Sequence, residues 1–429
     1  MENRYLNSMK HLIRAENTIP LGSQTFSKSR TQYPVGISPL YMKKAKGASI
    51  WDIDNNEYLD LVNALAAITL GYGDEKTEKA VKKQLKKGVS LSLPGILEAE
   101  VAELIVDMVP SAEKVRFGKN GTDATSAAIR IARAYTGRDH VAVCGYHGWQ
   151  DWYIGATTRS KGVPKEVSAL THHFEYNNIE SLKVQLEKFP NKFAAVILEP
   201  MNVNWPLDDF LGKVKIEAHK AGALLIFDET ITGFRFNNGG AQTLFDVIPD
   251  ISTFGKGMAN GFPLSAIVGT NAIMKEMENI FYSGTFGGEL LSLAAAKSVL
   301  TTYLEEDVCS RLAENGAQLA TSVQGAISEN KLDEVVKLSG HPSWKFITWT
   351  SNEKYSDLQL KTYFMQEMFK RGVLILNTHN ISLAHGRKVR EKITLAYSET
   401  LSSMAQLIGE SRLETALEVL PLEPLFKIR

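Results

Sequence analysis

The sequence has few cysteines and no excess of charge of either sign. Two cysteines, Cys144 and Cys309, occur in 429 residues, which argues against a disulfide framework and is typical of a reducing cytoplasm. Lysine and arginine together number 48, as do aspartate and glutamate. This balance indicates neither a nucleic-acid partner nor an anionic membrane surface. We therefore expect a cytoplasmic protein.

Long apolar runs are also missing. The run Ala194–Leu198 is far too short to span a bilayer, and the segment Met1–Arg4 has no apolar core of a signal peptide. Hydrophobic residues make up 44% of the chain and charged residues 22%, as in globular proteins with a substantial core. A chain of this length exceeds one typical domain, so we expect two substructures or one large domain with appendages.

Motifs of metal sites and of hydrolases are absent as well. His172 and His173 are adjacent and lack the spacing of zinc ligands, and no Gly-x-Ser-x-Gly nucleophile elbow occurs. The acidic stretch Asp52–Asp60 lacks the glycine and the closing glutamate of a calcium-binding EF-hand loop. It predicts a β-hairpin with an Asn-Asn turn instead. We predict no metal site.

Helical and strand patterns alternate from about residue 74 to residue 305. Nearly unbroken apolar runs, typical of strands buried on both faces, alternate with amphipathic segments. This alternation predicts an α/β fold with a mostly parallel central sheet, helices on both faces, and ligands at the carboxyl ends of the strands. The expected strands are Val115–Phe117, His140–Cys144, Phe193–Leu198 and Ala223–Phe227, and the expected helices are Glu98–Val109, Thr122–Tyr135 and Leu211–Lys220.

One lysine, Lys256, lies between Gly255 and Gly257 in a turn that follows a β-prone run. The flanking glycines allow a sharp turn and leave the amine reachable. An ordinary surface lysine is the simplest interpretation. A phosphate-binding P-loop is not, because the first glycine and the Ser or Thr after the lysine are missing. The residues upstream decide between these interpretations.

Two further stretches fall where strands end. Gly118–Asp123 precedes a helix, and free N–H groups with a glycine and a hydroxyl there can form a phosphate cradle, although for this stretch alone Thr122 as a plain helix cap is the favoured interpretation. Gly145–Gly148 follows a strand. Tyr146 in it can stack on a planar ring, but Tyr146 can equally be an ordinary packing residue and His147 a hydrogen-bonded core histidine.

The third stretch, Asp228–Arg235, closes a buried apolar strand with a carboxylate. A buried carboxylate is costly unless a cation or a hydrogen-bond donor accompanies it. Taken together, a reachable lysine, a buried aspartate, an aromatic ring and a helix start are what pyridoxal phosphate requires. The lysine forms a Schiff base, the aspartate keeps the pyridine nitrogen protonated, the aromatic ring stacks, and the helix start binds the phosphate.

These motifs resemble those of class III pyridoxal-phosphate aminotransferases, most closely the glutamate-1-semialdehyde aminomutase branch. Matching stretches run from Tyr58 to about Ala296, and more weakly through Ser382–His385. The resemblance implies the fold of aspartate aminotransferase, fold type I. It also implies a large cofactor domain at residues 74–308 and a small domain formed by residues 1–73 and 309–429.

The resemblance assigns roles residue by residue. Lys256 would form the Schiff base, and Asp228 would pair with the ring nitrogen. Thr285, in Ser283–Gly288, would reach the phosphate in the neighbouring subunit, which implies a homodimer. The remaining cofactor contacts would be Tyr146 on the ring, Asn120, Gly121 and Thr122 at the phosphate, and Glu199 near the site with Asn202 or Asn204.

The substrate-facing segments depart from the aminomutase pattern. Lys28 replaces the arginine that would bind a substrate carboxylate, and an ammonium is a poorer bidentate partner than a guanidinium. Ala64–Ala67 replaces a Ser-Trp-Gly-Pro motif, and the segment Asn377–Asn380 is short. The cofactor motifs of the family are retained, whereas the substrate-facing segments differ. This combination indicates the same cofactor chemistry on a different substrate.

We predict a ping-pong aminotransferase that moves an amino group from a small donor to an aldehyde or ketone, with Lys256 as the base. Similarity to aminotransferases found with surface-polysaccharide enzymes suggests a keto- or aldehydo-sugar as acceptor. The alternative is an intramolecular aminomutase of the glutamate-1-semialdehyde type, since both reactions use identical cofactor chemistry. A non-catalytic protein on the same fold is a third interpretation, which retention of Lys256 and Asp228 disfavours.

Overall fold

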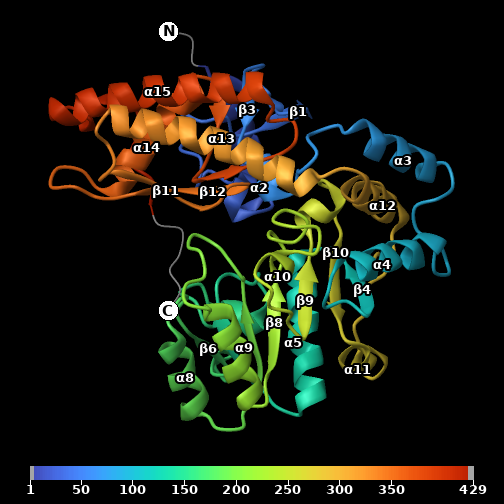
Figure 1. Cartoon of the computed structure of the whole chain (residues 1–429). Coiled ribbons are helices and arrows are strands. Elements are labelled where there is room, and N and C mark those ends of the chain that lie inside the picture. The colour runs from blue at the N-terminus through green and yellow to red at the C-terminus, as the bar shows by residue number, and fades with distance from the viewer. Residues whose placement is uncertain (1–3, 424–429) are drawn as a thin grey trace. The chain divides into compact units, whose positions relative to one another are not determined.

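The computed structural model describes residues 4–423, and their contacts divide into two compact units (Figure 1). Unit 1 comprises residues 4–74 and 311–423, and unit 2 comprises residues 75–310. The sequence placed domain boundaries after residues 73 and 308. Each unit has its own sheets, so each is described by itself.

Unit 2 is built on one seven-stranded sheet with strand order β4-β10-β9-β8-β7-β5-β6. Neighbouring strands from β9 to β6 are parallel, and β10 runs antiparallel to both of its neighbours. The sheet is therefore mostly parallel, as the sequence predicted. Its strands are β4 (Lys114–Gly118), β5 (His140–Cys144), β6 (Thr171–His173), β7 (Phe193–Leu198), β8 (Leu224–Asp228), β9 (Ile251–Phe254) and β10 (Ser265–Gly269).

Helices cover both faces of this sheet. Helix α5 packs on β7, β8, β9 and β10, whereas α8 and α9 pack on strands β5 to β8. The α-helices of unit 2 are α3 (Glu75–Leu85), α4 (Ile96–Met108), α5 (Gly121–Thr136), α6 (Asp151–Ile154), α7 (Lys165–Ser168), α8 (Ile179–Lys188), α9 (Phe210–Lys220), α10 (Ala241–Leu244), α11 (Asn271–Met274) and α12 (Leu290–Glu305), with 3-10 turns η3 (Lys256–Ala259) and η4 (Lys275–Glu278).

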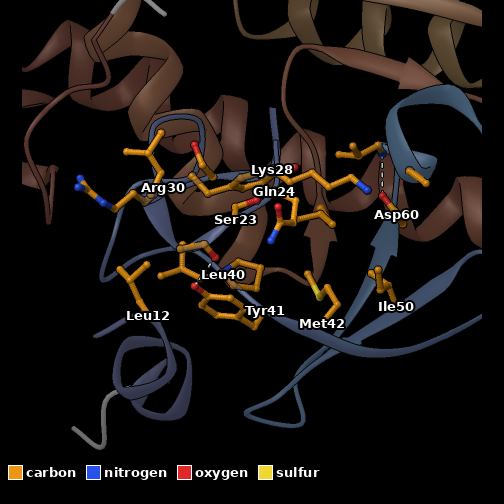
Figure 2. A pocket seen from close by; sticks show the side chains of 18 of the residues that line it. Leu12, Ser23, Gln24, Lys28, Arg30, Leu40, Tyr41, Met42, Ile50 and Asp60 are labelled. Carbon is orange, nitrogen blue, oxygen red and sulfur yellow. Dashed lines mark hydrogen bonds between the residues drawn. The ribbon is translucent and has the colours of Figure 1, made fainter. Parts of the chain in front are cut away.

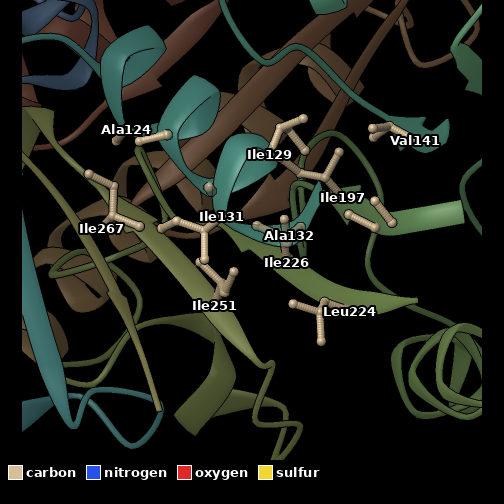
Figure 3. Close-up of a cluster of buried hydrophobic side chains, with 14 of the residues drawn as sticks. Ala124, Ile129, Ile131, Ala132, Val141, Ile197, Leu224, Ile226, Ile251 and Ile267 are labelled. Atoms are coloured by element: carbon tan, nitrogen blue, oxygen red, sulfur yellow. The ribbon is translucent and has the colours of Figure 1, made fainter. Parts of the chain in front are cut away.

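Successive residues of the central strands serve opposite faces, which explains their unbroken apolar runs. In β8, Ile226 packs with Ile129 and Ala132 of α5, a cluster shown in Figure 3. The next residue, Phe227, packs with Val214 of α9. Side chains alternate across a strand, so a strand covered by helices on both faces needs apolar residues at every position.

The predicted elements of unit 2 are confirmed within one or two residues. His140–Cys144 and Phe193–Leu198 are strands with those bounds, and the helix expected at Thr122–Tyr135 is α5. The antiparallel strand β10 was not expected. It returns the chain beside β9, so its first residue, Ser265, lies at the edge of the sheet where β9 ends.

Unit 1 contains two smaller sheets. The four-stranded sheet has order β1-β2-β3-β13 and includes the predicted hairpin, in which β2 pairs antiparallel with β3. The three-stranded sheet has order β11-β12-β14. The strands are β1 (Met42–Lys46), β2 (Ser49–Asp52), β3 (Glu57–Asp60), β11 (Val336–His341), β12 (Trp344–Trp349), β13 (Val373–Leu374) and β14 (Thr378–Asn380).

Long helices complete unit 1, as the change of pattern near residue 310 suggested. A short element, α2, is unusual because its four residues have backbone φ angles between 44° and 69°. This is a left-handed turn without glycine, a strained conformation. The helices are α1 (Leu6–Glu16), α2 (Asn63–Ala66), α13 (Val308–Glu329), α14 (Asp357–Lys370) and α15 (Arg387–Gly409), with 3-10 turns η1 (Pro20–Gly22), η2 (Phe26–Lys28) and η5 (Glu414–Ala416).

Within residues 4–423, no helix combines the length and the apolar character that crossing a membrane requires.

Candidate active site

Most of the predicted site residues of unit 2 come together at one edge of its sheet. Tyr146 follows β5, Glu199 follows β7, Asp228 ends β8, and Lys256 follows β9 after one glycine. These four strands are parallel neighbours, so their carboxyl ends share an edge. Four positions far apart in the chain therefore lie along one edge of the sheet.

Asp228 is buried and surrounded by donors. His147 Nδ1 lies 2.9 Å from its Oδ2, and Thr230 Oγ1 and Thr253 Oγ1 donate to Oδ1 at 2.5 Å and 3.1 Å. Burial alone would raise the pKa of Asp228, but the bonds from His147 and Thr230 outweigh it and hold the pKa below its usual range. The carboxylate is therefore ionised at neutral pH.

The histidine beside Asp228 is buried, with both ring nitrogens near acceptors. Its Nε2 lies 3.2 Å from the carbonyl oxygen of Cys144, while Nδ1 faces the Asp228 carboxylate. Carboxylates and carbonyls only accept, so two such bonds require a proton on each nitrogen. His147 is thus the cation that a buried aspartate needs, and the interpretation as a hydrogen-bonded core histidine is confirmed.

Glu199 is a second carboxylate at this edge, and its pKa is shifted in the opposite direction to that of Asp228. It accepts from the Tyr146 N–H at 3.1 Å and from Asn202 Nδ2 at 2.9 Å. Asn202, rather than Asn204, is therefore the asparagine next to it. Burial, followed by the negative charge of Asp228, raises the pKa of Glu199. A Cβ on Gly145 would lie 2.6 Å from Glu199 Oε2, so this close approach requires glycine.

The start of α5 reaches the same place. Asn120 caps the helix, and its N–H and that of Lys119 donate to Asp123 at 2.8 Å and 3.1 Å. The N–H groups of Gly121 and Thr122 make no hydrogen bond with the residues that the structure describes. They therefore stay available to an anion at the positive end of a 16-residue helix.

The Thr230 side chain lies close to both the start of α5 and the turn that carries Lys256. A Cβ on Gly121 would lie 3.0 Å from Thr230 Cγ2, and a Cβ on Gly255 would lie 3.5 Å from the same atom. The residue that donates to Asp228 is thus next to both the helix start and the turn before Lys256. The predicted phosphate cradle and the predicted lysine are brought together.

Lys256 is partly exposed and has a backbone φ of 42°, a conformation that side chains rarely adopt. Burial lowers the pKa of its amine, although the charges of Glu199 and Asp228 raise it in part. A lysine with a lowered pKa supplies more neutral amine at neutral pH than a surface lysine does, and the neutral form is the nucleophile and the base.

Two predicted residues are exposed. The Tyr146 side chain is 51% exposed, with its ring edge-on to Tyr153 at 5.6 Å between centroids. The stacking of Tyr146 on the cofactor ring stays a prediction. Thr285 lies in an exposed loop beside Phe286, which is 60% exposed. The reach of Thr285 into a neighbouring subunit stays a prediction.

Sequence reasoning missed three polar residues at this edge. Thr253 faces Asp228 because β8 and β9 pair in parallel with these two residues as partners. Thr230 is two residues past the aspartate, a local spacing that could have revealed it. Ser265 is buried, and its hydroxyl has no hydrogen-bond partner among residues 4–423. Strand register, which the sequence does not encode locally, positions Thr253.

Comparison with known proteins identifies the family. A profile of the family described as aminotransferase class-III matches residues 32–391. Glutamate-1-semialdehyde 2,1-aminomutase of Francisella philomiragia subsp. philomiragia is 37% identical over 76% of this chain and 79% of its own length. The protein of the same name from Aquifex aeolicus is 34% identical over 80% of this chain and 86% of its own length.

Two further relatives cover nearly the whole chain. 3-Aminobutyryl-CoA aminotransferase of Cloacimonas acidaminovorans is 30% identical over 93% of this chain and 97% of its own length. The solved structure of FumI from Sphingopyxis sp. MTA144, in its PLP internal aldimine form, superimposes with a TM-score of 0.88. It is 26% identical and covers 96% of this chain and 98% of its own.

The chain belongs to the class III aminotransferase family and is a pyridoxal-phosphate-dependent enzyme of fold type I. The recognition, fold, cofactor and enzyme class predicted from the sequence are therefore confirmed. None of these relatives is named for polysaccharide synthesis, so the predicted sugar acceptor is not supported, and we do not propose it. Most of the names instead match the alternative, the aminomutase.

The residues present fit the cofactor. The unpaired N–H groups of Gly121 and Thr122 suit a phosphate, and the orphaned Ser265 hydroxyl lies near the lysine turn, 3.9 Å (Cβ) from where a Cβ on Gly255 would be. Asp228 is held ionised for a protonated ring nitrogen. No group of three or more potential metal ligands occurs within residues 4–423, and none is required for this fit.

Proposed function

We propose that this enzyme is an aminomutase of the glutamate-1-semialdehyde type, which moves an amino group between two carbons of one substrate. The observation that carries amino-group transfer is the pairing of an ionised, buried Asp228 with a low-pKa Lys256 at one sheet edge. The names of the relatives at 37% and 34% identity favour the intramolecular reaction.

Bound pyridoxal phosphate supplies an aldehyde that condenses with amines and a ring that withdraws electrons from the attached carbon. Asp228 would keep the ring nitrogen protonated, because its carboxylate is stabilised against protonation by His147 and Thr230. Tyr146 would stack on the ring. Lys256 would hold the cofactor through its amine and, as a base, would move the proton at the substrate carbon.

The phosphate is assigned to the start of α5, through the N–H groups of Gly121 and Thr122 and with Asn120 as the cap. Glu199 lies next to the Tyr146 backbone and close enough to Asp228 for their charges to interact. We assign Glu199 to positioning the loop that carries the stacking ring. In a homodimer, Thr285 would add a hydroxyl to the partner's phosphate.

A second candidate is an aminotransferase acting between two molecules. Lys28 in place of the arginine and Ala64–Ala67 in place of Ser-Trp-Gly-Pro favour it, because both changes concern substrate-facing segments of the family. The relative named 3-aminobutyryl-CoA aminotransferase also favours it. Cofactor contacts do not separate the two candidates.

The deciding experiment supplies the purified holoenzyme with glutamate-1-semialdehyde alone. An aminomutase converts it to the isomeric 5-amino-4-oxopentanoate over many turnovers without another amine or carbonyl compound. An aminotransferase makes at most one product per site and resumes only when a second substrate is added. Multiple turnover would support the proposal, and failure to turn over with rescue by an added acceptor would reject it in favour of the second candidate.

Lys256→Ala serves as the control for either reaction. Loss of the base and of the covalent attachment should abolish turnover, a fall of at least about a thousandfold, while some cofactor stays bound through Asp228 and the start of α5. The measurement is the steady-state rate together with the absorbance of the retained cofactor. Full activity of this variant would contradict the assignment of Lys256.

A further inference from the structure

We assign the cavity of unit 1, about 440 Å³ in volume, to the substrate of the proposed reaction (Figure 2). Its lining includes Lys28 and Ala64, and both lie in segments that face the substrate in the aminomutase branch. The cavity is therefore part of the proposed function. A property that the proposed function does not include is found in unit 2, at an asparagine followed by glycine.

Four asparagines of the chain are followed by glycine, and this pair of residues has a chemistry of its own. The backbone nitrogen of the glycine can attack the side-chain amide of the asparagine, because glycine has no side chain to obstruct the approach. The product is a cyclic imide, and water opens it to aspartate or isoaspartate. The attack requires an accessible side-chain amide and a glycine N–H that is not held in a hydrogen bond. The four asparagines are Asn120, Asn238, Asn260 and Asn315.

Two of the four asparagines are blocked by burial or by helix geometry. Asn260 is only 7% exposed. Asn315 lies inside α13, where the N–H of Gly316 takes part in the helical hydrogen bonds. A Cβ on Gly316 would lie 1.9 Å from the Pro342 carbonyl oxygen, so the helix has no room for the imide there.

Asn238 is blocked by hydrogen bonds. Its Nδ2 donates to the Tyr303 carbonyl oxygen at 3.0 Å, and the N–H of Gly239 donates to Asn237 Oδ1 at 3.0 Å. Both reacting groups are therefore occupied, and a local opening has to break both bonds before the reaction can start.

Asn120 has none of these protections. It is exposed, and its backbone is extended rather than helical, with φ −110° and ψ 154°. Its Nδ2 donates to Asp123 Oδ2 at 3.4 Å, which is long for a hydrogen bond. The N–H of Gly121 makes no hydrogen bond within residues 4–423. Of the four pairs, this one therefore leaves both the attacked amide and the attacking nitrogen accessible.

The start of α5 also favours the reaction electrostatically. Gly121 is the first residue of this 16-residue helix, so its nitrogen lies at the positive end of the helix dipole. The attack places negative charge first on the Gly121 nitrogen and then on the oxygen of the Asn120 amide. The helix end stabilises that charge as it would stabilise a bound phosphate. The nitrogen that attacks Asn120 is thus one of the two assigned to the phosphate.

We propose that Asn120 is a site of spontaneous modification, converted to aspartate or isoaspartate when no phosphate covers Gly121. The Gly121 nitrogen gives its proton to a solvent base and bonds to Asn120 Cγ. The bond from Cγ to Nδ2 breaks, and Nδ2 takes a solvent proton and leaves as ammonia. Water then adds to one of the two imide carbonyl carbons and breaks the bond of that carbon to nitrogen. The proposal rests on the placement of the cofactor phosphate at Gly121 and Thr122, and not on the choice between aminomutase and aminotransferase.

The modification would weaken cofactor binding at the place where it occurs. The imide has no N–H at Gly121, and aspartate or isoaspartate adds a negative charge beside the phosphate. Bound cofactor in turn protects Asn120, because the phosphate holds the N–H that must lose its proton. At a free cofactor concentration of about 100 times Kd, about 1% of the sites are open, so the modification should slow about 100-fold.

Peptide mapping of the full-length enzyme by mass spectrometry, sampled over days in mildly alkaline buffer, measures the modification at all four asparagines. In enzyme depleted of cofactor, Asn120 should react at least about tenfold faster than the other three, which react only through local opening. Equal rates at the four positions would overturn the proposal. In urea the four rates should become similar. A preference for Asn120 that survives in urea would show that the fold does not cause it.

Adding back the cofactor tests the protection. Pyridoxal phosphate at about 100 times Kd should slow the modification of Asn120 about 100-fold, whereas pyridoxal, which has no phosphate, should leave the rate unchanged. Equal protection by pyridoxal, or none by pyridoxal phosphate, would reject the phosphate as the protecting group. Neither measurement involves turnover of glutamate-1-semialdehyde, so a failure of the aminomutase assignment would leave this result standing.

Asn120→Asp reproduces the charge of the product. Aspartate and asparagine cap helices about equally well, so the Tm should stay close to that of wild type, while the affinity for pyridoxal phosphate should fall at least about tenfold. Asn191→Asp is the matched control, because Asn191 is exposed and precedes β7 at the opposite edge of the sheet. It should leave the affinity unchanged, and equal affinities in the two variants would contradict the expected weakening. Asn120→Gln, whose longer side chain disfavours ring closure, should abolish the modification at this position.

Discussion

Asp60 of unit 1 and Asp228 of unit 2 are both buried, and the two aspartates differ in the direction of their pKa shift. The pKa of Asp228 in unit 2 is lowered, whereas that of Asp60 in unit 1 is raised. Burial acts against ionisation at both sites, and both carboxylates accept several hydrogen bonds. The difference lies in the kind of donor.

Asp228 has a histidine cation at 2.9 Å, whereas the donors to Asp60 are a phenol and backbone N–H groups. Glu229 shows the same rule. It is buried, its donors are Thr232 and the N–H groups of Ala241 and Gln242, and burial raises its pKa despite them. At Asp60 and Glu229, neutral donors do not offset the rise in pKa that burial causes, whereas at Asp228 the bonds from His147 and Thr230 do.

The largest expected effect comes from neutralising the ionised aspartate. Asp228→Asn retains the shape but cannot hold a proton on the ring nitrogen, so kcat should fall about 100- to 1,000-fold. Asp60→Asn is the matched control and should change kcat only a few-fold. Rate measurements on both variants check this. Similar losses in the two would show that the difference in ionisation has no part in catalysis.

His147→Gln should raise the pKa of Asp228, so that it shifts in the same direction as the pKa of Asp60. Without the cation, burial raises the pKa of Asp228, so its functional ionised form is lost at a higher pH than in wild type. The acid limb of kcat/KM should therefore move to higher pH, and activity at neutral pH should fall about tenfold, or roughly 1.4 kcal/mol. An unshifted acid limb would mean that His147 does not set this pKa. His173→Gln, which loses a bond to the Ala156 carbonyl, is the control.

Asp60 should make stability depend on pH in the opposite sense to Asp228. Its pKa is raised in the folded state, so its stabilisation is present below the unfolded pKa and is lost as pH rises through the folded value. Between about pH 4 and neutral, the free energy of unfolding should fall less steeply in Asp60→Asn than in wild type. Urea unfolding at several pH values measures the slope of the unfolding free energy against pH. This slope does not depend on the constant free energy that the variant loses with the hydrogen bonds of Asp60. Equal slopes would contradict a raised pKa.

The smallest effect is expected from Thr253→Val. This change removes one of the neutral donors to Asp228, at 3.1 Å, while His147 stays in place. Stability should fall by about 1 kcal/mol, and the acid limb of kcat/KM should move far less than in His147→Gln. Thermal unfolding and the pH profile together test it. A shift as large as that of the histidine variant would refute the distinction between charged and neutral donors.

The fold of unit 2 was largely predictable because its strands are buried on both faces. Phe193–Leu198 and His140–Cys144 could be assigned with their exact bounds, since apolar side chains at every position end abruptly at polar residues. The placement of Lys256 and Asp228 at one sheet edge was predictable for the same reason, because Asp228 ends one such strand and Lys256 follows another after one glycine. The local hydrophobic pattern was therefore sufficient to place those candidate site residues that lie at strand ends.

Contacts made across strands were not predictable in this way. The partnership of Thr253 with Asp228 depends on the register between β8 and β9. That of His147 with Asp228 depends on the loop that follows β5, a strand separated from β8 by β7. The left-handed turn at Asn63–Ala66 contains no glycine to mark it. Such features depend on residues distant in the chain.

The antiparallel strand β10 also has a mechanical consequence. The turn that carries Lys256 leaves the sheet at Phe254 and re-enters it at Ser265, where the two neighbouring strands pair. Both ends of this turn are held by the pairing of β9 with β10, so the backbone amides of these strands should exchange with deuterium slowly. If Lys256 forms the proposed Schiff base, the movement that it needs during catalysis falls to the four methylene groups of its side chain.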